Sequence, residues 1–188
     1  ERQPGSTFKL FVYTEAMNQG LTPCDKRRDE YIRMEVYDKV KHENTFWTPS
    51  NANGRFSGDS IPLKSAFAKS INSIAVRLGQ EMGIKNIINT AHQMGITNEL
   101  EDAPSLTLGS SDVKLLDMVD AYCCVANNGK HVTPVLVTRI VDKDGKEVYK
   151  ASADEEQAIP YKSAFFMQQL LIGGMREPGG TSQSLWAY

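Results

Sequence analysis

The chain has 188 residues, of which 40% are hydrophobic and 9% aromatic, enough apolar material for one packed core. Its 21 basic residues nearly balance its 23 acidic residues, so the net charge of −2 argues against nucleic acid or an anionic membrane surface as a partner. No apolar run has the length of a membrane span. The three histidines and three cysteines show no metal-ligand spacing, so we expect neither a metal site nor a cofactor.

The chain opens with a pattern that combines a nucleophile and a base. Pro4 and Gly5 break the chain, and a strongly apolar helix is predicted from Ser6 to about Gln19. Lys9 then lies beside Ser6, one turn along the same face. Because this helix has almost no polar face it should be buried, and burial lowers the pKa of a lysine. Ser6 and Lys9 are therefore a candidate nucleophile and its general base.

The spacing Ser-x-x-Lys is weak evidence by itself, because chance gives about one copy in a chain of this composition. A second copy runs from Ser111 to Lys114. We interpret it as the start of an amphipathic helix over about 112–126, capped by Ser110 or Ser111, with Lys114 facing solvent. Context, not spacing, separates the two copies.

The elements that follow the first helix predict a helical lobe with one hairpin. Residues 31–60 are rich in turn formers and predict a long loop. Helices are predicted over 62–82, 84–94, 112–126 and 162–175, and a hairpin over 132–150 precedes a polar linker at 151–160. The apolar end, 185–188, resembles the start of a strand. We therefore expect an α+β fold with an incomplete central sheet, and an excised fragment of a larger domain.

A second polar group, Ser70-Ile71-Asn72, falls inside the predicted helix 62–82 among apolar neighbours. Buried polar side chains need hydrogen-bond partners. The residues alone leave two interpretations open. Ser70 can bond within its own helix while Asn72 caps a kink, or both residues can belong to a catalytic site.

Residues 2–188, essentially the whole chain, resemble the transpeptidase domain of bifunctional class A penicillin-binding proteins, and six segments in the right order carry the resemblance. They are residues 2–9 (RQPGSTFK), 48–51 (TPSN), 63–75 (LKSAFAKSINSIA), 104–109 (PSLTLG), 121–122 (AY) and 126–129 (ANNG). This ordered set is far more specific than either short motif. Residues 1–188 are accordingly expected to form a partial transpeptidase domain of the β-lactamase/transpeptidase-like fold.

The resemblance implies acyl transfer on the D-Ala-D-Ala end of peptidoglycan stem peptides, with β-lactam antibiotics as covalent inhibitors. Ser6 would be the nucleophile, and its backbone N–H would form half of an oxyanion hole. Lys9 would accept the Ser6 proton, Ser70 would relay a proton to the leaving group, and Asn72 would hold the substrate amide. The resemblance also implies a glycosyltransferase domain in the same parent chain. It further implies a location on the periplasmic side of the bacterial cytoplasmic membrane, with the anchor outside this chain.

One family element is missing from the sequence, since no Lys-Thr-Gly or Lys-Ser-Gly occurs. That element normally supplies a cation and the second oxyanion donor, so we expect the fragment to be weakly active or inactive.

Two alternatives remain. A serine β-lactamase would need a Glu-x-x-Leu-Asn element, which the acidic segment 99–102 does not provide, or, in class D, a valine at the position of Asn72. A non-catalytic helical lobe would instead pack against a partner or form a homodimer, with the hairpin at 132–150 as the exchanged element.

Overall fold

The computed structural model describes residues 1–38 and 41–187. Its helices are η1 (Gly5–Phe8, 3-10), α1 (Lys9–Asn18), α2 (Leu63–Ala68), α3 (Asn72–Met82), α4 (Ile84–Gln93), η2 (Pro104–Leu108, 3-10), α5 (Leu115–Ala126), α6 (Tyr161–Arg176) and η3 (Gln183–Ala187, 3-10). Its strands are β1 (Lys26–Arg28), β2 (Met34–Asp38), β3 (Glu43–Trp47), β4 (Ser60–Pro62), β5 (Lys130–Val132), β6 (Arg139–Val141), β7 (Glu147–Lys150) and β8 (Glu155–Gln157). The strands form four antiparallel pairs: β1–β4, β2–β3, β5–β8 and β6–β7.

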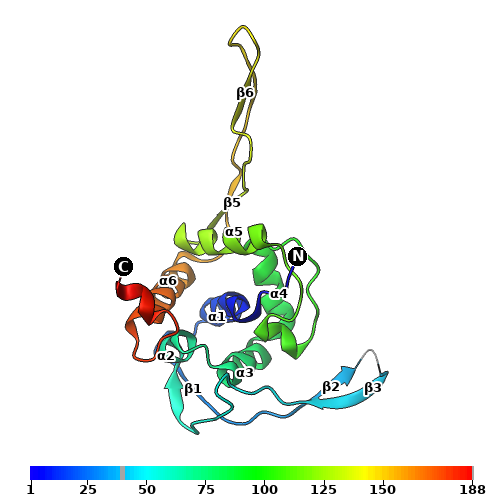
Figure 1. Cartoon of the computed structure of the whole chain (residues 1–188), viewed down its shortest axis with the longest axis vertical. Coiled ribbons are helices and arrows are strands. Elements are labelled where there is room, and N and C mark those ends of the chain that lie inside the picture. The colour runs from blue at the N-terminus through cyan, green and yellow to red at the C-terminus, as the bar shows by residue number, and fades with distance from the viewer. Residues whose placement is uncertain (39–40, 188) are drawn as a thin grey trace.

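Helix α1 is the centre of the molecule, and the other helices surround it (Figure 1). Helices α3, α4 and α6 contact it directly. Every residue from Lys9 to Met17 is buried, which confirms the burial predicted from the lack of a polar face. Most of the apolar core lies around this helix, so α1 is held on all sides and its first turn has little freedom to move.

Local chemistry ends α1 where the sequence predicts. The N–H of Gly20 bonds to the carbonyl of Met17, and the N–H of Leu21 bonds to the carbonyl of Ala16. This pair of bonds is a Schellman motif, which needs a left-handed residue, and Gly20 adopts a φ of 98° without a Cβ penalty. The segment Asn127-Asn128-Gly129, whose composition predicts a left-handed stop, ends α5 in this way, with φ of 57° at Asn128 and 87° at Gly129.

The predicted helix over 62–82 is wrong in one respect: it is broken in two. Helix α2 ends at Ala68, α3 begins at Asn72, and between them Ser70 adopts a left-handed φ of 53°. Ser70 and Asn72 therefore lie in and just after a helix break, not inside a helix. The apolar spacing is helical on both sides of the break, which is why the pattern alone does not reveal it.

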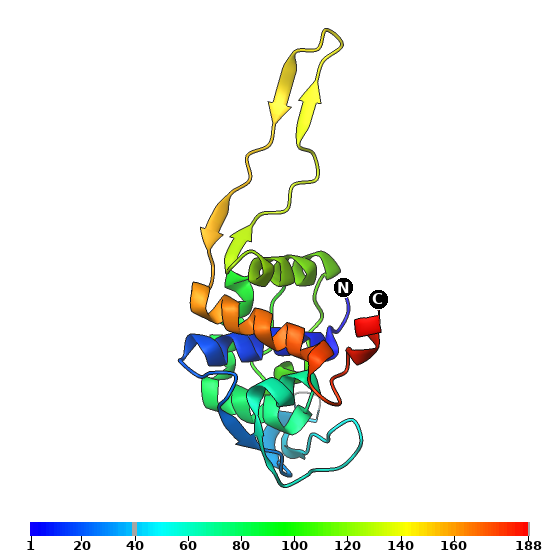
Figure 2. The ribbon, with the colours of Figure 1, turned by 90° about the vertical axis from the view of Figure 1, so that its left-hand side faces the viewer.

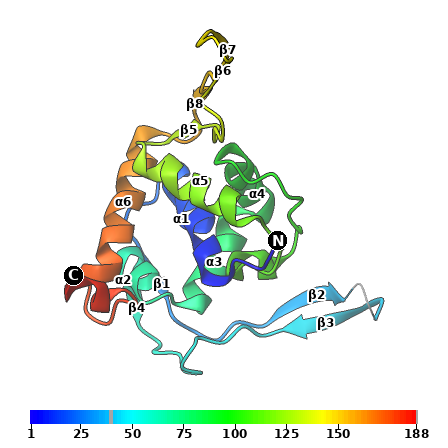
Figure 3. The same ribbon diagram turned by 45° about the horizontal axis from the view of Figure 1, so that its top comes forward.

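The long loop predicted over 31–60 is also wrong, because β2 and β3 form a hairpin there (Figure 3). The hairpin is held by a small cluster in which Ile32 and Met34 are buried against Val76 of α3. Val36 also packs against this cluster, so Met34 and Val36, alternate residues of β2, face the helix, as expected of a strand with one covered face.

A long two-stranded arm projects from the helices (Figure 2). Its base is the β5–β8 pair and its outer part the β6–β7 pair, so the predicted hairpin is confirmed but extends into the segment 151–160 that we expected to be a linker. Strands β6 and β7 are exposed along their whole length. Helix α5 begins at Leu115, later than predicted, and neither Ser110 nor Ser111 caps it.

The expected strand at the end of the chain is wrong for residues 185–187, which belong to η3, and Tyr188 lies outside the described residues. The α+β class is confirmed: the described strands form only two-stranded pairs around a helical lobe. No helix in the described part of the chain combines the length and the apolar character needed to cross a bilayer.

Candidate active site

The first turn of the central helix presents Ser6 to solvent while it buries Lys9. Ser6 lies in η1, which runs directly into α1, and its side chain is exposed. Lys9, the first residue of α1, is 1% exposed. The first N–H groups of a helix lack partners within the helix, so this end can stabilise negative charge that develops near Ser6.

The Lys9 ammonium contacts the helix break between α2 and α3. Lys9 Nζ donates hydrogen bonds to Ser70 O at 2.7 Å, to Ser70 Oγ at 2.9 Å and to Asn72 Oδ1 at 2.7 Å. These acceptors lie more than 60 residues away along the chain. Tertiary structure thus brings three of the four predicted site residues together.

Ser6, the fourth predicted site residue, does not share these hydrogen bonds, because none of the three bonds from Lys9 goes to the Ser6 hydroxyl. The two side chains nevertheless line the same cavity of about 240 Å³, together with Ser70. Thr181 and Ser182, from the turn after α6, line that cavity as well. The cavity is large enough for a small acyl group to meet both Ser6 and Ser70.

Burial lowers the pKa of Lys9 from its ordinary value of 10.5 to about 8. Desolvation is the cause, because the ammonium leaves water for a site that contains no carboxylate among its hydrogen-bond partners. With such a pKa, about a tenth of the Lys9 side chains are neutral at pH 7, so a free base is available near neutrality.

The conformation of Ser70 is strained, and the strain has a visible consequence. A left-handed φ costs a residue with a side chain on the order of 1 kcal/mol. Here it occurs at the residue whose carbonyl and hydroxyl oxygens both accept from Lys9. The break therefore presents two oxygens of one residue to a single ammonium, which a continued helix would prevent.

Asn72 is held in one orientation by a neighbouring loop. Its Nδ2 donates to the carbonyl of Ser50 at 2.8 Å, which leaves Oδ1 to accept from Lys9. Its backbone N–H and that of Ser73 both donate to Asn51 Oδ1, at 3.0 and 3.1 Å. Asn51 thus caps the start of α3 from a distance of 21 residues, a role normally filled by a local residue.

A buried carboxylate, Asp29, fixes Asn51 in turn. Asn51 Nδ2 donates to Asp29 Oδ1 at 2.7 Å, and Ser73 Oγ donates to the same oxygen at 2.6 Å. Burial by itself would raise the pKa of Asp29, but hydrogen bonds from Ser73, Ser57 and Asn51 bring it below its usual value. The charged form is stabilised, and the network keeps Asn51 pointed at α3.

A second distant residue shapes the turn that carries Ser6. Gly109, directly after η2, has a φ of 75° and lies against Gly5, whose N–H donates to the Gly109 carbonyl at 3.3 Å. A Cβ at Gly109 would lie 2.2 Å from the Gly5 carbonyl oxygen. Only glycine therefore lets the two backbones approach this closely. Asn51 and Gly109 both lie in segments that carry the family resemblance, but no local pattern indicates either role.

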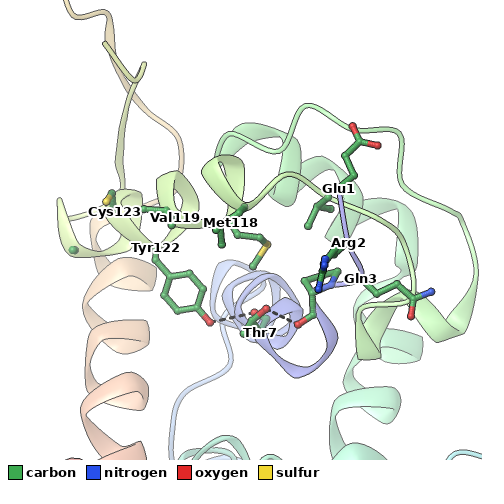
Figure 4. A pocket seen from close by; sticks show the side chains of 12 residues that line it. Glu1, Arg2, Gln3, Thr7, Met118, Val119, Tyr122 and Cys123 are labelled. Carbon is green, nitrogen blue, oxygen red and sulfur yellow. Dashed lines mark hydrogen bonds between the residues drawn. The ribbon is translucent and has the colours of Figure 1, made fainter. Parts of the chain in front are cut away.

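Tyr122 also lines an apolar cavity of about 850 Å³ (Figure 4). Tyr122 lines both this cavity and the one at Ser6, and its hydroxyl donates to the Thr7 carbonyl at 3.2 Å. The larger cavity is lined from α5 and from the first residues of the chain, among them Arg2, Met118 and Val119. Within the described residues, no group of three or more potential metal ligands lies close together. The predicted lack of a metal site stays a prediction.

Residues 1–187 match the family model of the penicillin-binding protein transpeptidase domain. The chain belongs to this family. Penicillin-binding protein 2D of Bacillus subtilis is 34% identical over 173 residues, which is 92% of this chain and 24% of the relative. Penicillin-binding protein 1A of Pseudomonas aeruginosa is 36% identical over 155 residues, 81% of this chain and 18% of the relative. The chain thus spans about a quarter or less of these relatives.

Solved structures support the fold of this transpeptidase domain. Penicillin-binding protein 1A from Haemophilus influenzae matches 97% of this chain with a TM-score of 0.88 at 22% identity, and the match covers 32% of that structure. Penicillin-binding protein A from M. tuberculosis, solved as an imipenem acyl-enzyme complex, matches 93% of this chain with a TM-score of 0.78 at 22% identity, covering 44% of that structure. The β-lactamase/transpeptidase-like fold inferred from the resemblance is confirmed.

Proposed function

We propose that this chain carries the nucleophile side of a peptidoglycan D,D-transpeptidase site, with Ser6 as the residue that is acylated. The observation that carries this proposal is the buried Lys9, with its lowered pKa, one turn from an exposed serine and bonded to Ser70 and Asn72. Burying a lysine without a carboxylate partner costs free energy, and a base that works near neutral pH is a function that explains such a residue.

In this proposal Lys9 acts in its neutral form. A neutral amine has two N–H groups and one lone pair, so it can keep two of its three present hydrogen bonds and turn the lone pair to Ser6 Oγ. Ser6 Oγ then attacks the carbonyl carbon of the penultimate D-Ala, and its proton passes to Lys9. Ser70 Oγ lies 2.9 Å from Lys9 Nζ and can carry that proton to the departing D-Ala amine.

The oxyanion formed in this step needs donors. The backbone N–H of Ser6, in the first turn of the helix, supplies one, and one such donor contributes on the order of 3 kcal/mol to the transition state. Asn72 binds the substrate amide with its Oδ1, the atom that accepts a hydrogen bond from Lys9 in this structure. The sequence contains no Lys-Thr-Gly or Lys-Ser-Gly to supply a second donor, so acylation of this chain should be slow.

The experiment is intact-mass measurement after incubation with benzylpenicillin, on wild type and on Ser6→Ala. One stable adduct that disappears in Ser6→Ala supports the proposal. An adduct on both variants would assign the nucleophile to another residue and overturn it. An adduct that forms and hydrolyses within seconds would favour the serine β-lactamase alternative.

The wider setting follows from the same proposal. The substrate is the D-Ala-D-Ala stem peptide, β-lactams are its covalent inhibitors, and a glycosyltransferase domain belongs to the same parent protein. We place that protein at the bacterial cytoplasmic membrane, with this domain on the periplasmic side. Several relatives that are 32% to 36% identical to this chain over the aligned residues carry the name penicillin-binding protein 1A, which supports this setting.

A further inference from the structure

The turn that carries Ser6 is held from outside at both of its neighbouring residues. On one side, the N–H of Gly5 donates to the Gly109 carbonyl at 3.3 Å. On the other side, the carbonyl of Thr7 accepts a hydrogen bond from the Tyr122 hydroxyl at 3.2 Å (Figure 4). Gly109 follows η2 and Tyr122 lies in α5, so two separate elements fix the backbone before and after the nucleophile.

Tyr122 reaches this turn from one face of a supported helix. Met118, Val119 and Ala126 stand three or four residues from Tyr122 in α5, and with it they line the 850 Å³ cavity. The half-buried ring of Tyr122 packs against the main apolar core, and α5 packs against α6. The hydroxyl is therefore held in place by packing before it bonds to a carbonyl 115 residues earlier in the chain.

Thr7 transmits the position of this hydroxyl to the nucleophile. Thr7 and Tyr122 both line the cavity that contains Ser6 and Lys9. The Thr7 hydroxyl also donates to the Pro4 carbonyl at 2.7 Å, which closes the turn across Ser6. A carbonyl oxygen has two lone pairs, so the Thr7 carbonyl can accept from Tyr122 as well as from an N–H of the helix. A change in the Tyr122 hydrogen bond thus acts on the residue next to Ser6.

Tyr122 remains a hydrogen-bond donor over the pH range in which Lys9 titrates. Burial raises the pKa of the Tyr122 hydroxyl above its ordinary value of 10.0, whereas the pKa of Lys9 is about 8. The bond to Thr7 therefore exists in both protonation states of Lys9. This arrangement suits a fixed support and not a second base.

We propose that Tyr122 is a positioning residue for acyl transfer, which acts through the Thr7 carbonyl to keep Ser6 Oγ and the Ser6 N–H aimed into the cavity. This inference rests on the proposed function. Attack requires the nucleophile to lie about 3–3.5 Å from the substrate carbonyl carbon in an aligned geometry. Loss of the Tyr122 hydrogen bond should therefore slow the chemical step more than it weakens binding of the substrate.

The test is Tyr122→Phe, which keeps the ring and removes the hydroxyl. Intact mass followed over time, at several benzylpenicillin concentrations, gives the rate constant of acylation and the dissociation constant of the complex that precedes it. We expect the rate constant to fall about fivefold, the equivalent of one hydrogen bond, while the dissociation constant changes by less than about twofold. The ratio of the two rate constants should be the same at pH 7 and pH 9, because Tyr122 keeps its proton at both.

Two control variants separate positioning from a loss of stability. Tyr13→Phe makes the same chemical change in α1, where the buried Tyr13 hydroxyl has no hydrogen-bond partner among the described residues. Thr90→Val removes a buried hydrogen bond to Glu15 of the same helix. Both variants should be acylated at the wild-type rate. A rate constant that falls equally in Thr90→Val and Tyr122→Phe would overturn the inference, because the role of Tyr122 would then be structural only.

Nuclear magnetic resonance tests the contact without depending on acylation. In ¹³C,¹⁵N-labelled Tyr122→Phe, the carbonyl carbon resonance of Thr7 should shift and the order parameter of the Ser6 N–H should fall, whereas neither should change in Tyr13→Phe. An unchanged Thr7 resonance, or acylation of Tyr122→Phe at the wild-type rate, overturns the inference. Absent acylation of the wild type counts against the proposed function, and the resonance data then decide by themselves whether Tyr122 holds the turn.

Discussion

Replacing Lys9 with methionine should change how the stability of this protein depends on pH. In the folded chain the pKa of Lys9 is about 8, whereas an exposed lysine in the unfolded chain titrates near 10.5. The gap between these two values corresponds to about 3 kcal/mol of free energy. Folding therefore opposes protonation of Lys9. Methionine does not titrate, so Lys9→Met removes this pH-dependent contribution to the free energy of unfolding.

The sign follows from proton binding in the two states. Below pH 8 both states hold the Lys9 proton, and the full cost of burying the ammonium is present. Between pH 8 and 10.5 the unfolded state binds more protons, so the unfolding free energy of the wild type rises with pH. Relative to Lys9→Met, the wild type should thus gain about 3 kcal/mol over this interval. Other titrating groups are common to both proteins and cancel in the difference.

Urea unfolding followed by circular dichroism, at several pH values from 7 to 10.5, measures this difference. Lys85→Met is the control for the loss of a lysine, because Lys85 is 84% exposed and lies in α4, away from the site. The acylation rate of the wild type should rise with pH and level off above about 8. A wild-type minus Lys9→Met difference that stays constant from pH 8 to 10.5 would refute the desolvation argument, and with it the availability of Lys9 as a base near neutrality.

Three further predictions concern the supports of the site and the arm. Asn51→Ala should lower the free energy of unfolding by about 3 kcal/mol and slow acylation by benzylpenicillin, because it leaves the N–H groups of Asn72 and Ser73 without an acceptor. The control is Thr90→Val, which removes a buried hydrogen bond to Glu15. It should destabilise the fold and leave the pH profile of acylation unchanged. Gly109→Ala should lower the free energy of unfolding by more than about 2 kcal/mol and slow acylation, because its Cβ meets Gly5. The control is Gly145→Ala, because Gly145 has a similar φ of 80° and a Cβ there would have no atom within 4 Å. Equal losses of stability in both variants would contradict the close-approach argument. Replacing residues 134–153 with an Asn-Gly turn should shift the midpoint of thermal unfolding by less than about 2 °C, since the outer arm is exposed. The same change should abolish any increase of the mass with concentration in light scattering. A dimer that survives would exclude the arm as the exchanged element.

Some of the site follows from local pattern. The apolar run after Ser6 requires a buried helix, the spacing of three places Lys9 one turn from Ser6, and burial of Lys9 then lowers its pKa. Each step depends on residues within two turns of one helix. For the same reason the stops at Gly20 and Asn128 are predictable, because a left-handed residue after a helix is a local requirement.

The strands at 34–38 and 43–47 show the limit of this approach. Turn-forming residues dominate 31–60 and obscure the short alternation of apolar and polar residues in these two strands. That alternation indicates a strand only if a surface is present to cover the apolar side. That surface is Val76, which lies on a helix about 30 residues further along the chain. A strand with one covered face can be recognised only when the cover is known.

The amino-acid pattern predicts the buried first helix, the lysine one turn after Ser6 and, through six ordered segments, the family. The exposure of Ser6, the break of the second helix at Ser70, the capping of α3 by Asn51 and the approach of Gly109 to Gly5 became known from the folded structure. The physical reason is distance along the chain. Helix propensity and burial act between neighbouring residues, whereas the last three features exist because side chains and backbones far apart in sequence satisfy or exclude one another in the folded core.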